Sequence, residues 1–172
     1  SFNPNDMRDA QPYKRRNRAI TDLFEPGSTL KPLAILAGLD HGVIKADDTI
    51  NTYPGWMRLG GSLVKDTRNH GEMTLREILK VSSNMGVAKI SQMLPKEYLV
   101  GLYQKVGFGE DTGTMMVGES SGLFYPNRRW SDFEIATLSY GYAVSVSTAQ
   151  VARLYATMGS GGISRPLTIL KQ

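Results

Sequence analysis

The eight residues from Glu25 to Pro32 restrict the fold of this chain more than any other stretch. They read Glu-Pro-Gly-Ser-Thr-Leu-Lys-Pro. Because Pro32 has no backbone N–H to donate, it is tolerated only in the first turn of a helix, which predicts a helix that begins close to Ser28. Apolar residues at helical spacing continue to Asp40, and Gly42 follows as a helix end.

Ser28 and Lys31 stand three residues apart, a spacing that places both side chains on one face of the expected helix. The Lys31 amine then lies within proton-transfer reach of the Ser28 oxygen, which is the arrangement of an activated nucleophile. A helix start also offers N–H groups that can bind an oxyanion. The stretch therefore indicates a nucleophile with its activating group.

A second set of polar residues, Ser82-Ser83-Asn84, follows a predicted helix over about 74–81. Thr74 and Glu77 have the spacing of a capping box at the start of that helix. The Ser82 hydroxyl could pass a proton between Lys31 and a leaving amine, and the Asn84 amide could orient Lys31 and hold a substrate carbonyl. Ser and Asn are also favoured at helix ends, so a purely capping role remains open.

The rest of the chain predicts a mainly α fold with one short β-hairpin. The uncharged stretch from Ile135 to Ala152 contains hydroxyls and a glycine, and it predicts a buried helix and not a membrane span. Residues 1–27 read as an extended approach. The remaining expectations are a hairpin within 49–68 around Gly60-Gly61, helices over about 84–94, 96–106 and 147–158, and a loop over 107–129.

Composition excludes several classes of function. The 172 residues are 41% hydrophobic and 21% charged, which is typical of one soluble domain. A net charge of +4, with one basic cluster at Lys14–Arg18, lacks the basic face and stacking aromatics of a nucleic-acid binder. With no cysteine and only His41 and His70, thiol catalysis and a metal site are not expected. We expect chemistry without metal or cofactor.

Three short patterns in the chain resemble catalytic motifs by chance. Ser62 and Lys65 repeat the Ser-x-x-Lys spacing, but in the expected hairpin residues i and i+3 project to opposite faces. The stretch Gly118–Gly122 matches Gly-x-Ser-x-Gly, but Pro126 prevents the helix that this motif requires. Asp111-Thr112-Gly113 is more typical of a turn than of an aspartic-protease loop.

Taken together, the motifs and their context resemble the transpeptidase domain of class B penicillin-binding proteins, above all the septal, cell-division member of Gram-negative bacteria. The resemblance covers nearly the whole chain. Its segments are Phe2–Asn5, Asn17–Asp22 running into Glu25–Pro32, Lys80–Asn84 and Ala136–Tyr142.

The resemblance implies D,D-transpeptidation of peptidoglycan by a serine acyl-enzyme, without metal or cofactor. Carried over by position, Ser28 is the nucleophile that attacks the stem peptide, Lys31 is the general base, and Ser82 with Asn84 forms the second motif. Tyr142 and Glu25 are implied substrate-binding neighbours of the cleft. β-Lactams would acylate Ser28. This mechanism needs the pKa of Lys31 to fall from about 10.4 through burial or a nearby positive charge.

The family also has a third motif, Lys-Ser/Thr-Gly, on an edge strand of a central sheet. No lysine of this chain is followed by Ser or Thr and then Gly. We therefore expect 1–172 to be a single-domain fragment holding the helical part of the α/β penicillin-binding-protein and serine β-lactamase-like fold, with the central sheet largely absent. Such a fragment could lack activity alone.

The resemblance further implies a membrane-anchored parent protein on the periplasmic face of the bacterial inner membrane, working with divisome membrane proteins. Two other functions remain open at this point. One is a non-catalytic scaffold module, and the other is a serine β-lactamase or a β-lactam sensor, which shares the Ser-Lys chemistry.

Overall fold

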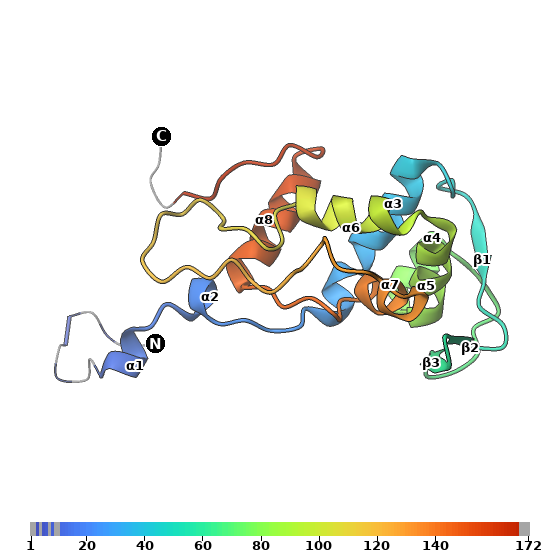
Figure 1. Ribbon diagram of the computed structural model, residues 1–172, viewed down its shortest axis with the longest axis horizontal. Coiled ribbons are helices and arrows are strands. Elements are labelled where there is room, and N and C mark those ends of the chain that lie inside the picture. Colours follow the sequence, from blue (N-terminus) through green and yellow to red (C-terminus); the bar gives the residue numbers. More distant parts are fainter. Residues whose placement is uncertain (1–2, 4, 7, 9–10, 169–172) are drawn as a thin grey trace.

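The computed structural model describes residues 3, 5, 6, 8 and 11–168, and Figure 1 shows a mainly helical chain with two short strand pairs. The helices are α1 (Pro12–Arg15), α2 (Arg18–Thr21), the 3₁₀ helix η2 (Gly27–Leu30), α3 (Lys31–His41), α4 (Leu75–Lys80), α5 (Asn84–Met93), α6 (Lys96–Lys105), α7 (Asp132–Ser139) and α8 (Thr148–Gly159). The strands are β1 (Thr49–Asn51), β2 (Trp56–Leu59), β3 (Ser62–Lys65) and β4 (Glu72–Thr74).

The helix expected at Ser28 is present, but its first turn is the tighter 3₁₀ helix η2, and the α-helix α3 begins at Lys31. Pro32 lies in the first turn of α3, where its missing N–H leaves no hydrogen bond unmade. Gly42 ends α3 in the left-handed conformation, with a φ of 78°. Ser28 therefore stands one turn before α3.

Both strand pairs are antiparallel, and one of them was not expected from the sequence. The predicted hairpin is formed by β2 and β3, with Gly60 and Gly61 at positive φ in its turn. The unexpected pair joins β1 to β4, with Ile50 opposite Met73. The twenty residues 52–71 lie between these strands, so no local turn pattern predicts their pairing.

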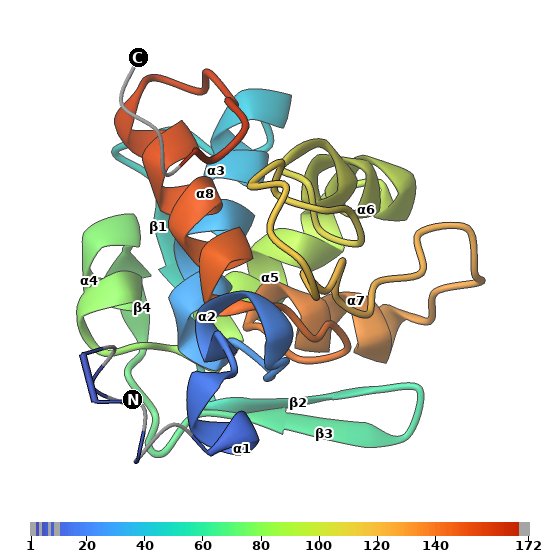
Figure 2. The same ribbon diagram turned by 90° about the vertical axis from the view of Figure 1, so that its left-hand side faces the viewer.

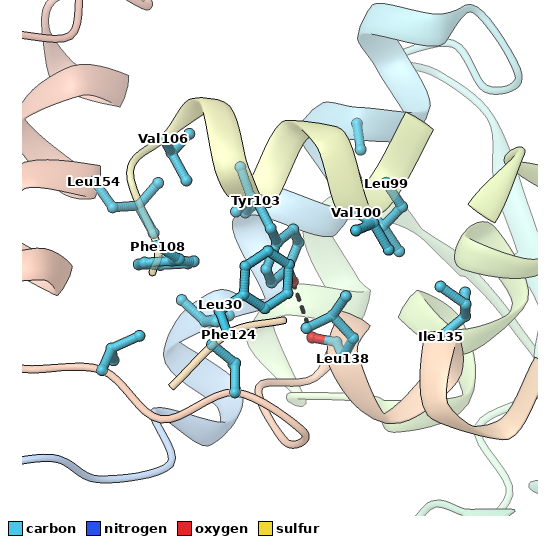
Figure 3. Packing of buried hydrophobic residues seen from close by; sticks show 14 of the residues in the cluster. Leu30, Leu99, Val100, Tyr103, Val106, Phe108, Phe124, Ile135, Leu138 and Leu154 are labelled. Atoms are coloured by element: carbon cyan, nitrogen blue, oxygen red, sulfur yellow. Dashed lines mark hydrogen bonds between the residues drawn. The ribbon is translucent and has the colours of Figure 1, made fainter. Parts of the chain in front are cut away.

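One buried cluster packs α6 and α8 against the start of α3 (Figure 3). Tyr103 lies at its centre, fully buried, and its hydroxyl donates a 2.9 Å hydrogen bond to the Leu138 carbonyl. Burial raises the pKa of the Tyr103 phenol. Leu30 of η2 and Leu33 of α3 belong to the same cluster, and each buried leucine contributes about 1.5–3 kcal/mol.

A second buried cluster covers the opposite face of α3 with α4, α5 and the strands. Ala34 and Ile35 are the members that α3 contributes. Helices α4 and α5 approach closely at Gly86, where a Cβ atom would lie 2.7 Å from Ile78 Cγ1. Because α3 is packed on two sides, its N-terminal end is held in place by both clusters.

The buried helix expected across the uncharged stretch 135–152 is wrong as one element, while the separate helix expected over 147–158 is confirmed as α8. The uncharged stretch is divided into α7 and α8 by residues 140–147. Gly141 and Ala143 have left-handed φ values of 86° and 64°, which no helix accommodates. A capping box between Ser147 and Gln150 then starts α8. No helix in the described part of the chain is long and apolar enough to cross a membrane.

The N-terminal expectation also needs a correction, because the extended approach contains the four-residue helices α1 and α2.

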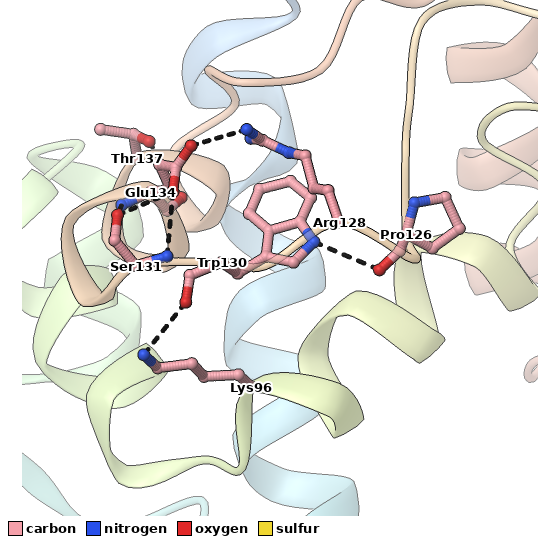
Figure 4. A network of polar contacts seen from close by, with 7 residues as sticks. All are labelled: Lys96, Pro126, Arg128, Trp130, Ser131, Glu134 and Thr137. Carbon is pink, nitrogen blue, oxygen red and sulfur yellow. Dashed lines mark hydrogen bonds and ion pairs between the residues drawn. The ribbon is translucent and has the colours of Figure 1, made fainter.

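The expected loop over 107–129 contains no helix or multi-residue strand within the structure's described ranges. Figure 4 shows how its end is held: the Arg128 guanidinium lies 4.0 Å from the Trp130 ring centroid, and its Nη1 contacts the Glu134 carboxylate at 2.6 Å. The indole N–H of Trp130 donates to the Pro126 carbonyl at 3.3 Å.

Candidate active site

The turn that carries Ser28 is held from two sides. The Gly27 N–H donates a 2.9 Å hydrogen bond to the Gly141 carbonyl, and the Tyr155 hydroxyl of α8 donates to the Thr29 carbonyl at 2.9 Å. A Cβ atom at Gly141 would lie 1.9 Å from the Gly27 oxygen, so only glycine permits this approach. The side chain of Ser28 remains exposed in this fixed turn.

Ser82 reaches the same place through the junction between α4 and α5. Its N–H donates to the Leu79 carbonyl and the Ser83 N–H donates to the Ile78 carbonyl, which together form a Schellman end to α4. Glycine usually occupies the left-handed position of this motif, but here Ser82 holds it with a φ of 56°. Ser83 is the residue that caps α5, because its hydroxyl accepts from the Gly86 N–H at 2.8 Å. Ser83 thus serves as the cap of α5, which leaves the Ser82 hydroxyl free of a capping role.

Ser28, Ser82 and Lys31 are joined by a chain of hydrogen bonds. Lys31 Nζ donates to Ser82 Oγ at 2.8 Å and also to the Ser82 carbonyl, and Ser82 Oγ donates to Ser28 Oγ at 3.0 Å. The i to i+3 spacing suggested a direct path from Lys31 to Ser28. The hydrogen bonds of the described residues instead connect the two through Ser82.

The environment of Lys31 lowers its affinity for a proton. The side chain is 2% exposed, and this burial lowers the pKa of Lys31 to about 8, although the negative charge of Asp66 partly opposes the shift. The lowered pKa brings the loss of the Lys31 proton closer to neutral pH. Of the two possible causes of a lowered Lys31 pKa, burial and a nearby positive charge, burial is the one that acts here.

Asn84 begins α5 beside these groups, but its side chain does not bind Lys31 in the structure. Its Nδ2 makes one long contact of 3.5 Å with the Lys65 carbonyl, and its backbone N–H donates to Asp66 Oδ1 at 2.6 Å. The expected orienting contact between Asn84 and Lys31 is therefore not among the hydrogen bonds of the described residues. The amide remains available to a ligand.

Asp66 is a site residue that the sequence did not suggest. Its Oδ2 accepts from the Ser83 hydroxyl at 2.5 Å, and its Oδ1 accepts from the N–H groups of Asn84 and Met85. A carboxylate at the N-terminus of α5 also interacts favourably with the helix dipole. Asp66 lies in the segment after β3, and no local pattern there predicts that it reaches a helix many residues later.

A cavity of about 550 Å³, here called the catalytic cavity, brings the four predicted catalytic residues together. Its lining consists of Ser28, Lys31, Lys65, Asp66, Thr67, His70, Val81, Ser82 and Asn84. Thr67 and His70 were not singled out in the sequence. Throughout the described ranges, no group of three or more His, Asp or Glu side chains could hold a metal ion.

The two residues expected to bind substrate lie outside this lining. Glu25 is exposed just before the turn that holds Ser28. Tyr142 is 48% exposed, and its ring packs edge-on against Tyr140 at 5.8 Å between centroids. Tyr142 directly follows Gly141, whose carbonyl accepts a hydrogen bond from the Gly27 N–H. Tyr142 therefore lies near the turn of Ser28 but is not part of the lining of the catalytic cavity.

Comparison with known proteins gives a consistent result over the whole chain. The family model described as penicillin binding protein transpeptidase domain matches residues 1–172. The chain is 45% identical over 171 residues to the peptidoglycan D,D-transpeptidase FtsI of Escherichia coli (strain K12), a match that covers 99% of this chain and 29% of that protein. It is 37% identical over 172 residues to the probable peptidoglycan D,D-transpeptidase PenA of Neisseria flavescens, covering 100% of this chain and 42% of that protein.

The fold agrees with a solved structure. The apo structure of the TP domain from Burkholderia pseudomallei penicillin-binding protein 3 superimposes with a TM-score of 0.87 and 34% sequence identity, covering 93% of this chain and 48% of that one. The chain thus spans less than half the length of these relatives. The expected fold class, the helical part of such a domain, is confirmed. This chain belongs to the family of penicillin-binding protein transpeptidase domains.

Proposed function

We propose that the protein to which this chain belongs is a peptidoglycan D,D-transpeptidase that acts through a serine acyl-enzyme. The observation that supports this most strongly is the hydrogen-bonded path from Lys31 through Ser82 to Ser28, in one cavity with Asn84. A buried amine that can lose its proton near neutral pH is what a serine nucleophile needs. The names of the relatives agree with this reading.

The direction of the hydrogen bonds determines when Ser28 can react. While Lys31 is protonated it donates to Ser82, and Ser82 donates to Ser28, so the Ser28 proton has no acceptor in this path. Once Lys31 is neutral, its nitrogen accepts the Ser82 proton and Ser82 Oγ accepts the Ser28 proton. Deprotonation of Lys31 thus reverses both bonds and makes Ser28 nucleophilic.

The reaction then follows from these positions. Ser28 Oγ attacks the carbonyl carbon between the two terminal D-alanines of a stem peptide, and the C–N bond of the tetrahedral intermediate breaks. The proton held by Lys31 returns through Ser82 to the leaving D-alanine amine. An amine from a neighbouring strand attacks the ester carbonyl and gives one proton to the same path. The ester C–O bond then breaks, and the path returns that proton to Ser28 Oγ. Asn84 would hold the substrate carbonyl, while Tyr142 and Glu25 would contact substrate from outside the catalytic cavity.

The proposal extends to ligands and location. β-Lactams would acylate Ser28 as mimics of the D-alanine dipeptide. Relatives named FtsI support a role in cross-linking the wall at the division septum, with divisome membrane proteins as partners. Such a role would place the protein on the periplasmic face of the inner membrane.

A fluorescent penicillin tests this function in the full-length protein. We expect one label per protein at Ser28, and loss of the label in Ser28→Ala. The chain provides two matched controls, Ser62→Ala in the second Ser-x-x-Lys pattern and Ser120→Ala in the Gly-x-Ser-x-Gly pattern, which should keep the label. Persistent labelling of Ser28→Ala would refute the assignment.

A further inference from the structure

One face of the β2–β3 hairpin is turned away from the protein core. Cross-strand partners in an antiparallel pair share a face, and here Trp56 lies opposite Lys65 while Arg58 lies opposite Leu63. All four are exposed, with Trp56 at 52% and Leu63 at 45%. The alternate residues face the core, where Val64 is 2% exposed. Figure 2 shows this hairpin projecting along one edge of the molecule.

The outward face of the hairpin forms one wall of a cavity of about 450 Å³, here called the hairpin groove. The rest of its lining comes from Pro54 and Gly55 before the hairpin and from Asp66, Arg68 and Asn69 after it. Gly55 allows these two segments to approach, because a Cβ atom there would lie 2.9 Å from Asn69 Cα. The Gly55 carbonyl also accepts from the Asp66 N–H at 2.9 Å, which joins the segments on either side of the hairpin.

The hairpin groove is positively charged, and its cations are not neutralised within the described structure. Arg58 donates only to the Gly61 carbonyl, at 2.9 Å, and the side chains of Lys65 and Arg68 have no hydrogen-bond or ion-pair partner among the residues that the structure describes. Asp66, the acid in the lining, directs both carboxylate oxygens to the start of α5. Three cations therefore line the groove, and its one carboxylate, Asp66, is hydrogen-bonded to the start of α5 and not to any of them.

The hairpin groove continues into the catalytic cavity, because Lys65 and Asp66 line both. A chain held with its reactive carbonyl at Ser28 can thus extend along Lys65 into the groove. Trp56, Leu63 and Pro54 offer apolar surface to the aliphatic part of such a ligand. The planar guanidinium groups of Arg58 and Arg68 match the geometry of a carboxylate.

We infer that the hairpin groove binds a free carboxylate of the stem peptide, upstream of the bond that Ser28 attacks. This inference rests on the proposed function, because it places the remote part of the same substrate. The groove would act by orienting the peptide, and binding energy from this remote contact would be used to position the scissile carbonyl. A β-lactam, which lacks that upstream peptide, would not need the groove.

A pair of donor peptides tests the inference with the full-length protein. Both end in two D-alanines, and they differ only in whether the upstream carboxylate is free or amidated. We expect the double variant Arg58→Gln with Arg68→Gln to lower kcat/KM for D-alanine release from the free-carboxylate peptide by about 10- to 100-fold, the loss typical of charge-assisted hydrogen bonds. Release from the amidated peptide and acylation by penicillin should change by less than about twofold.

The matched control removes two other exposed cations, Lys45→Gln with Arg76→Gln, and should leave all three rates unchanged. Equal losses on the two peptides, or no loss in the groove variant, would overturn the inference while the proposed function stands. If the wild-type protein released no D-alanine from either peptide and was not acylated by penicillin, the proposed function itself would fail. If the double variant lost penicillin acylation as well, the double variant Arg58→Lys with Arg68→Lys would be measured instead. It keeps both positive charges but not the planar guanidinium groups, so kcat/KM for the free-carboxylate peptide should still fall more than kcat/KM for the amidated peptide.

Discussion

The hydroxyl of Ser83 donates a 2.5 Å hydrogen bond to the carboxylate of Asp66, and this contact ties the segment after β3 to the first residue before α5. The same carboxylate accepts from the N–H groups of Asn84 and Met85. Asp66 thereby fixes the backbone of the motif that carries Ser82. It is a positioning residue for that motif and not a group that touches the reacting atoms.

Replacing Asp66 by Asn should have two separable effects in the full-length protein. The loss of a charged cap should lower stability by about 1–2 kcal/mol, measured as a lower thermal midpoint. Because the Asp66 charge raises the pKa of Lys31, its removal should also move the pH profile of penicillin acylation to lower pH. Asp47→Asn, which removes an exposed carboxylate elsewhere, is the control. A lower stability with an unmoved pH profile would show that Asp66 acts on structure alone.

The pH dependence of acylation tests Lys31 as the base. The rate constant for penicillin acylation should rise with pH and level off above about 8, because that is where Lys31 loses its proton. Rapid mixing with a chromogenic β-lactam across pH 6–10 measures this limb. A rate that is flat from pH 6 to pH 10 would contradict the assignment of Lys31.

Stability gives an independent measure of the same shift. The pKa of Lys31 is lower in the folded protein, about 8, than the value of about 10.4 in the unfolded chain, so the unfolded state binds the extra proton between these values. The contribution of Lys31 to stability therefore rises with pH across this window and is least favourable below pH 8. Lys31→Met should be stabilised relative to wild type near pH 7, and the difference should shrink by pH 10. Unfolding midpoints of both proteins at the two pH values measure it, and a constant difference would argue against the shift.

Two substitutions at Ser82 should separate backbone strain from chemistry. Both Ser82→Gly and Ser82→Ala remove the hydroxyl that links Lys31 to Ser28, so both should slow acylation strongly. Only alanine must keep a Cβ atom at a φ of 56°, so Ser82→Ala should be less stable than Ser82→Gly by about 1 kcal/mol. Thermal unfolding measures the difference. If alanine were the more stable variant, the left-handed conformation would not be a source of strain.

The contact between Gly27 and Gly141 should be intolerant of a single methyl group. In Gly141→Ala the new Cβ would overlap the Gly27 oxygen, displacing the turn of Ser28 and costing roughly 2–4 kcal/mol. Gly101→Ala, inside α6 with open space around the new atom, is the control and should gain about 0.5–1 kcal/mol. Melting curves and penicillin labelling together measure both effects. Wild-type labelling by Gly141→Ala would mean that the turn does not depend on this contact.

The sequence predicted those parts of the site that are encoded locally. Pro32 restricts the start of α3, and the capping box at Thr74 and Glu77 defines α4, so the positions of Ser28 and Ser82 on the chain followed from short-range rules. Family resemblance then supplied their roles. What could not be predicted depends on tertiary contacts. Asp66 contacts α5, and β1 pairs with β4, although each pair of segments is far apart in the sequence. The start of α8 at Ser147 was predicted, but the left-handed turn at Gly141 after α7 was not, since it depends on the close approach to Gly27.

Helix α3 lies between two separate buried clusters, and the 3₁₀ turn η2 that leads into it carries Ser28, the proposed nucleophile. Loosening on either side would shift Ser28 relative to Ser82, and a hydrogen bond of 3.0 Å tolerates little displacement. Reactivity with penicillin should therefore decline before the molecule melts, whichever cluster is weakened. Penicillin labelling can thus report on the integrity of the core for substitutions made far from Ser28.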